Sequence, residues 1–135
     1  MVLRVGIGLA YVNQNSRDLS STTFAALCSA VVDALLGAAG LNDLRPEFSI
    51  LSPVDKLKQI ELKLYYHNYS IVNIDCTFEG DLELKPGVLK DFAQQIADLL
   101  FISPQNFTVK NYWTENLAGI KRIQVIAMIQ KSEEI

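Results

Sequence analysis

The first strand that the sequence predicts carries large side chains on one side only. Residues 2–12 alternate between bulky apolar residues and a nearly bare side, namely Leu3, Val5, Ile7, Leu9 and Tyr11 against Arg4, Gly6, Gly8 and Ala10. Glycine weakens a strand, and its repetition at Gly6 and Gly8 predicts that the backbone of another element approaches closely there. This strand must therefore be a tightly covered part of a sheet.

A long apolar helix is predicted to follow over residues 24–39, with N-cap candidates at 20–23 and a natural stop at Gly40. Apolar residues recur along it at helical spacing: Phe24, Leu27, Cys28, Val31, Val32, Leu35 and Leu36. The opposite face has small residues and one charge, Asp33. Either a second element covers that face, or an alanine-rich surface lies in water. The segment is short for a membrane span, so we expect a soluble, cytoplasmic protein without a membrane partner.

The middle and end of the chain read as further strands and one more helix. Residues 48–51 form a short strand in this interpretation, and the alternation in 60–64 predicts a hairpin with 72–78 across a turn at His67 and Asn68. A second helix is expected from Pro86 to a stop at Pro104. Strands are expected over 107–113 and 123–130.

These elements predict a single α+β domain spanning residues 1–135. The order β-α-β-β-β-α-β-β divides into halves at 2–51 and 69–113. Right-handed crossovers then give a two-layer sandwich of pseudo-repeated β-α-β units, with two helices on one face of a mixed sheet. Ile71, Ile126, Met128 and the Gly/Ala side of the first strand would make the other face apolar. We therefore expect a homo-oligomer, as a homotrimer, in which sheets pack together.

Composition excludes several functions. The net charge of -3 argues against nucleic acid, which selects basic surfaces. The single histidine, His67, rules out a metal site with two histidines, and no cofactor or metal is expected. Cys28 and Cys76 lie in apolar patterns and are interpreted as buried core residues. No catalytic residues are identified.

Aromatic residues with polar tips form the most suggestive group, at Tyr65, Tyr66, Tyr69, Tyr112 and Trp113. Such residues fill cores and interfaces or form the wall of a ligand site. If they lie together with cationic side chains, they could bind a small organic anion. The predicted ligand-binding residues are Arg4, Lys110, Tyr112 and Trp113.

Residues 89–109 resemble the tautomerase superfamily, the group of macrophage migration inhibitory factor. The similarity lies in Leu89-Lys90-Asp91-Phe92, in Ala97-Asp98-Leu99-Leu100 and in 102–109, where Ile-Ser-Pro precedes an aromatic strand. The resemblance implies a doubled β-α-β fold and a trimer. The family's base is a proline after the initiator methionine, whereas this chain has Val2 there and its first proline is Pro46.

Three functions remain open at this stage. The preferred hypothesis is a non-catalytic, tautomerase-like protein for ligand binding or assembly, so the prediction leans against an enzyme. The first alternative is an isomerase that uses another base. The second is a ferredoxin-like subunit that pairs with a different protein through its sheet.

Overall fold

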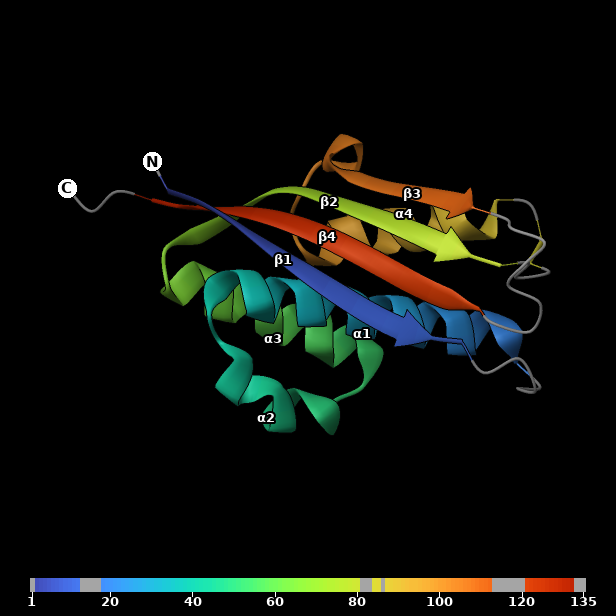
Figure 1. The fold of residues 1–135 in the computed structure, drawn as a ribbon, viewed down its shortest axis with the longest axis horizontal. Coiled ribbons are helices and arrows are strands. Elements are labelled where there is room, and N and C mark those ends of the chain that lie inside the picture. The colour runs from blue at the N-terminus through green and yellow to red at the C-terminus, as the bar shows by residue number, and fades with distance from the viewer. Residues whose placement is uncertain (1, 13–17, 81–83, 86, 113–120, 133–135) are drawn as a thin grey trace.

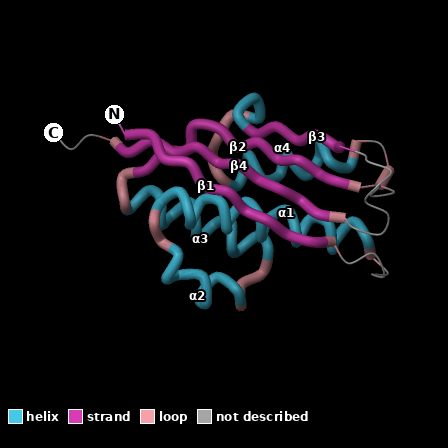
Figure 2. Tube along the Cα trace, in the orientation of Figure 1, coloured by secondary structure: helices cyan, strands magenta, loops and turns pink. Residues whose placement is uncertain are grey.

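A computed structural model describes residues 2–12, 18–80, 84–85, 87–112 and 121–132. A four-stranded mixed sheet forms one layer and helices form the other (Figure 1). All the longer helices lie on one face of the sheet, and the short α2 lies farthest from it (Figure 2). The predicted α+β sandwich class is confirmed. The predicted strand at 123–130 and the predicted helix between Pro86 and Pro104, which spans Val88–Leu99, are confirmed as well.

The sheet has the strand order β1-β4-β2-β3. Strand β4 (Arg122–Lys131) is antiparallel to both β1 (Val2–Tyr11) and β2 (Tyr69–Glu79). Strand β3 (Phe107–Tyr112) runs parallel to β2, and the crossover between them contains α4 (Val88–Leu99). The predicted β-α-β unit over 69–113 is therefore present up to Tyr112, and Trp113 lies outside the described residues.

Helix α1 (Leu19–Ala39) packs directly on the bare side of β1. A Cβ atom placed on Gly8 would lie 1.9 Å from the carbonyl oxygen of Ala30, and one on Gly6 would lie 1.9 Å from that of Ala34. The predicted close approach of another backbone is confirmed, and the approaching element is α1. The sheet thus covers Ala30, Ala34 and Ala38, which decides between the two alternatives for the alanines of that face, whereas Asp33 pairs with Arg45 outside the sheet contact.

The predicted stop of α1 at Gly40 is confirmed, but the predicted N-cap at 20–23 is wrong, because the helix begins at Leu19 and Asp18 caps it. The side chain of Asp18 accepts a hydrogen bond from the Ser21 backbone N–H at 3.1 Å, and this bond lowers the pKa of the carboxyl. Gly40 ends the helix in the left-handed conformation. By length and composition α1 could span a membrane, but most of it is buried within the sandwich, as in the core helix of a soluble protein.

The segment between α1 and β2 is helical, so two strand predictions are wrong. Residues 45–49 form α2 (Arg45–Ser49) after the 3-10 helix η1 (Asn42–Leu44), and residues 53–66 form α3 (Pro53–Tyr66). The first half of the chain therefore lacks the predicted second strand, and no β-α-β repeat forms there. Because 60–64 belong to α3, the predicted hairpin is absent, and His67 caps the helix instead.

Both cysteines are free and fully buried in the core, which confirms their interpretation. The side of β1 that faces away from the helices is apolar and exposed, whereas the prediction placed the Gly/Ala side there. The exposed apolar side chains of this open face are Leu3, Val5, Ile7, Leu9, Tyr11 and Ile126. An exposed apolar row of this kind is typical of a surface that self-associates.

Candidate functional site

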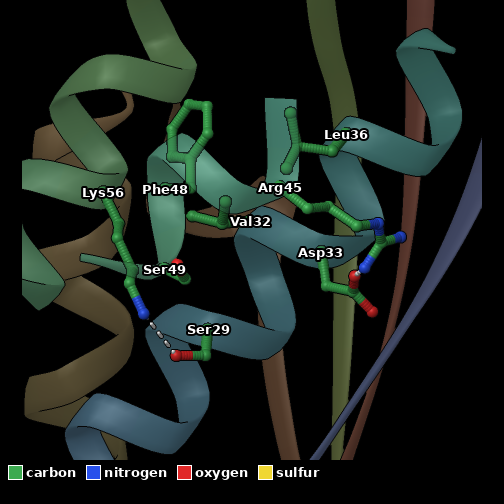
Figure 3. A pocket seen from close by; sticks show the side chains of 8 residues that line it. All are labelled: Ser29, Val32, Asp33, Leu36, Arg45, Phe48, Ser49 and Lys56. Atoms are coloured by element: carbon green, nitrogen blue, oxygen red, sulfur yellow. Dashed lines mark hydrogen bonds and ion pairs between the residues drawn. The ribbon is translucent and has the colours of Figure 1, made fainter. Parts of the chain in front are cut away.

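A pocket lined by charged and hydroxyl side chains lies among α1, α2 and α3 and has a volume of about 130 Å³. Three helices contribute side chains to it (Figure 3). Its lining residues are Ser29, Val32, Asp33, Leu36, Arg45, Phe48, Ser49 and Lys56. We refer to it as the three-helix pocket.

Helical spacing explains why α1 presents its share of the three-helix pocket. Ser29, Val32, Asp33 and Leu36 occur at i, i+3, i+4 and i+7, which places them on one face of the helix. That face is the one that the sheet does not cover. The helix therefore offers two polar groups and two apolar groups to the same cavity.

Two cations reach the pocket from different helices (Figure 3). Arg45 of α2 forms an ion pair with Asp33 and donates to the side-chain oxygen of Asn42 at 3.0 and 3.2 Å. Lys56 of α3 donates from Nζ to the hydroxyl oxygen of Ser29 at 3.1 Å. The guanidinium and the ammonium are thus held in place by neutral or anionic partners.

Local capping positions both cations. Pro46 occupies the first turn of α2, where its missing N–H costs no hydrogen bond. Ser52 is the N-cap of α3, and its hydroxyl accepts from the Asp55 backbone N–H at 3.2 Å. This cap fixes the start of α3 one turn before Lys56. The first turns of both helices therefore set where the charges lie.

A second, more open hollow of about 550 Å³ lies nearer the beginning of α1. Ala25 of this hollow and Ser29 of the three-helix pocket are one helical turn apart on α1. The hollow is lined by Ser20, Ser21, Phe24, Ala25, Ser52, Pro53, Val54, Phe92 and Gln95. The three-helix pocket thus has cationic side chains, and the neighbouring hollow has hydroxyl and aromatic side chains.

This arrangement suits an anion with several oxygens. Arginine and lysine supply up to eight N–H donors in total, and serine hydroxyls add further donors. Charge-assisted hydrogen bonds of this type bind phosphate and carboxylate groups. A cavity of about 130 Å³ is smaller than a drug-sized site, so it fits one phosphoryl group rather than a whole nucleotide.

Other reactive groups do not contribute a nucleophile or a metal site here. Burial raises the pKa of the Cys28 thiol to about 12, although nearby Lys56 opposes the shift. Burial raises the pKa of Cys76 as well. In the described part of the chain no three His, Cys, Asp or Glu side chains gather as a metal site.

Two of the predicted ligand residues, Arg4 and Lys110, lie on opposite edges of the sheet. Arg4 lies on β1, facing α1, and its Nε donates to the Ala38 carbonyl oxygen at 2.5 Å. Lys110 lies on β3, at the other edge of the sheet and on its open face. Its Nζ atom lies 3.0 Å from Oδ2 of Asp75. Tyr112 ends β3. A ligand contact by Lys110, Tyr112 or Trp113 stays a prediction.

Sequence reasoning missed Arg45, Lys56 and Ser29. Arg45 and Lys56 lie outside every helix and strand that the sequence predicted, so they were not assigned to a site. The available signal was Ser52-Pro53 followed by Asp55, which is typical of a helix start.

Comparison with known proteins gives the family. The sequence profile of the YgbB family matches residues 25–131. A relative from Caldicellulosiruptor bescii, a 2-C-methyl-D-erythritol 2,4-cyclodiphosphate synthase, is 32% identical over 98 residues, which are 67% of this chain and 62% of that protein. The synthase of the same name from Enterococcus faecalis is 26% identical over 110 residues, 76% of this chain and 70% of its own length. The chain thus matches less than two thirds of the first relative.

Solved structures agree on the fold. The CDP complex of IspF from Plasmodium falciparum superimposes with a TM-score of 0.75 at 18% identity, covering 97% of both chains. At this identity the likeness concerns the fold alone.

These findings correct three predictions. The resemblance to the tautomerase superfamily is wrong, because the YgbB profile matches residues 25–131 and thus includes the stretch 89–109 on which the resemblance was based. The hypothesis of a non-catalytic protein and the prediction that leaned against an enzyme are overturned as well, because the relatives are named as synthases. The chain belongs to the YgbB family.

Proposed function

We propose that this chain is a phosphoryl-transfer enzyme of the cyclodiphosphate synthase class, which binds phosphate groups of its substrate between Arg45 and Lys56. The observation that carries the proposal is the YgbB family match over residues 25–131, together with relatives that are named as synthases. The matched range includes every residue that lines the three-helix pocket. Family and site chemistry therefore support the same class of substrate.

The relatives' name specifies a product in which one diphosphate bridges two oxygens of methylerythritol. CDP in a structurally similar protein suggests a substrate that carries both a CDP group and a second phosphate. In that reaction an oxygen of the second phosphate attacks the CDP phosphorus nearest the sugar alcohol. The bond from this phosphorus to the bridging oxygen breaks, and CMP leaves with the electron pair.

The attacking phosphate is already ionised at neutral pH, so this reaction does not require a general base. The reaction instead requires positive charge that stabilises the transition state, and it requires that the two phosphate groups are held next to each other. Arg45 and Lys56 supply two positive charges at one pocket, where Asp33 pairs with Arg45, and Ser29 supplies a hydroxyl group. The hollow beside them, of about 550 Å³, has room for the cytidine.

Divalent cations commonly assist reactions of diphosphates. The residues that the structure describes offer no cluster of three metal ligands, so a metal does not fit them. We derive no step through a metal. The described contribution to charge stabilisation is that of Arg45 and Lys56.

We further propose that the protein is a cytoplasmic homotrimer, formed through the open face of the sheet. A closed cyclic assembly buries the same apolar row on each copy, and this avoids open-ended association. Ile7 lies in the middle of that row and is 57% exposed. An Ile7→Lys variant should yield a folded monomer in sedimentation velocity, instead of a species with three times the mass of 15.0 kDa. An unchanged mass would contradict this interface.

The activity is tested with a CDP-linked methylerythritol phosphate, by measuring CMP release and cyclic diphosphate formation with ³¹P NMR. Lys56→Gln and Arg45→Gln should each lower the rate at least tenfold and weaken CDP binding in calorimetry. Lys58→Gln is the matched control, because this exposed lysine of α3 does not line the pocket. Absence of turnover by the full chain, or equal effects of all three variants, would refute the proposal.

The same titration tests the predicted contact at Lys110. A Lys110→Gln variant that binds CDP normally would restrict the site to the helical layer, and a weakened variant would extend it to the open face.

A further inference from the structure

Phe101 has an unusual backbone and an unusual environment. It follows the end of α4 with a φ of 57°, in the left-handed region that normally selects glycine at this position. The Ile102 N–H closes the helix end by donating to the Ala97 carbonyl oxygen at 3.0 Å. The ring gains little from burial, since the residue is 81% exposed. Fold stability alone does not explain a phenylalanine here, and such outliers point to a function.

Phe101 forms one wall of a separate cavity of about 230 Å³. The cavity lies between the end of α3, the start of β2 and the end of α4. Its lining residues are Glu61, Leu64, Tyr65, Tyr69, Ser70, Ile71, Leu100, Phe101 and Ile102. It shares none of these with the three-helix pocket. We refer to it as the aromatic pocket.

Three rings of the aromatic pocket accompany one carboxylate. Glu61 and Tyr65 are four residues apart on α3 and therefore project from the same face of the helix. Glu61 is half-buried, and within the described residues its carboxylate forms neither a hydrogen bond nor an ion pair. An unpaired, partly desolvated carboxylate favours a cation as its partner.

One of the rings already attracts a cation within the chain. The Nζ atom of Lys131 lies 5.6 Å from the centroid of the Tyr69 ring. The faces of aromatic rings attract ammonium and guanidinium groups, and such groups are commonly held by several rings together with an acidic residue. The pocket is too small for a drug-sized molecule, but it accommodates the head of an organic cation.

We propose that the aromatic pocket binds an alkylammonium or guanidinium group between Glu61 and the rings of Tyr65, Tyr69 and Phe101. The group belongs either to a free small cation or to a lysine or arginine side chain of another protein. The charge of Glu61 and the three rings, that of the exposed Phe101 among them, together define this site.

The probe is choline chloride, titrated into the full chain and followed by the NMR signals of the aromatic rings. Its neutral control is 3,3-dimethylbutan-1-ol, in which carbon replaces the charged nitrogen at nearly the same shape. We expect saturable shifts with choline and at least tenfold weaker binding of the neutral analogue. Blocked single-residue lysine and arginine derivatives then distinguish the two sources of the cation, and the tighter binder identifies the class.

Variants locate the site. Glu61→Gln should weaken choline binding about tenfold. Phe101→Gly should weaken it about fivefold without loss of folding, because glycine accepts a φ of 57°. Glu47→Gln is the control for Glu61→Gln, since Glu47 is exposed and does not line the pocket. The inference is overturned if the charged and neutral probes bind equally, if neither binds, or if Glu61→Gln binds choline as tightly as the unmodified chain.

Discussion

Replacing Gly8 by alanine tests the contact between β1 and α1 most directly. The added Cβ would lie 1.9 Å from the Ala30 carbonyl oxygen and 2.9 Å from the Ala34 nitrogen. Both atoms belong to the helix backbone, so no side chain can rotate to make room. Because real Cβ atoms stay at least about 3 Å from such atoms, α1 must move away from the sheet by about 1 Å.

A gap of about 1 Å removes a quarter to a half of the dispersion energy of each separated contact. Along α1 the affected residues include Ala30, Ala34 and Ala38, which are all buried. Overpacking of a core costs about 1–3 kcal/mol, and an overlap with backbone belongs at the upper end. We therefore expect Gly8→Ala to lower the free energy of unfolding by about 3 kcal/mol or more, measured by urea denaturation followed by circular dichroism.

Gly37→Ala is the matched control, on the helix α1 that Gly8 contacts. A Cβ there has its closest neighbour, the side-chain oxygen of Asn42, at 4.0 Å. Alanine is a better helix former than glycine, so this variant should gain about 0.5–1 kcal/mol. A loss below about 1 kcal/mol for Gly8→Ala, or equal losses for both variants, would refute the close-approach argument.

Three further predictions concern buried and capping groups. Thr23→Val should raise the free energy of unfolding by about 1 kcal/mol, because the buried Thr23 hydroxyl finds no partner among the described residues; a destabilised variant in the same urea experiment would contradict this. Cys28 and Cys76 should resist thiol reagents at pH 8 in the native state and react fully in urea. Burial raises the pKa of the Cys28 thiol from 9.0 to about 12 in the native state. Between pH 9 and pH 12 the thiol is therefore protonated in the native state and ionised in the unfolded state. The free energy of unfolding should fall by about 1.4 kcal/mol for each pH unit in this range. Cys28→Ala should remove that thiol's share of the slope, and an identical slope would contradict the assignment. Arg4→Met should cost about 1 kcal/mol, because the Ala38 carbonyl at the end of α1 loses its donor; unchanged stability would assign Arg4 another role.

Much of the sheet could be predicted from the sequence, but α3 could not be separated from a strand by the pattern used. Ile60, Leu62 and Leu64 alternate, which favours a half-buried strand. Leu57, Ile60 and Leu64 also fit a helical stripe, and these are the residues that are buried, whereas Leu62 is 42% exposed. The cap at Ser52 distinguishes the two, since a capped first turn commits the following residues to a helix.

The candidate site was less predictable than the fold. Arg45 and Lys56 form a site only because α2 and α3 pack beside Ser29 and Asp33 of α1. No spacing in the sequence relates residues on three helices, because their proximity is a result of tertiary packing. The strain at Phe101 is likewise visible only as a backbone angle.

The two sides of β1 fix its register from both directions. On the inner side, only Gly6 and Gly8 leave room for the backbone of α1. On the outer side, the alternate positions carry the apolar row centred on Ile7. A shift of one residue would press that row against α1 and turn the glycines outward, so it would lose the helix contact and the apolar surface together. The same alternation that makes the sandwich possible therefore also places the surface through which we propose that copies associate.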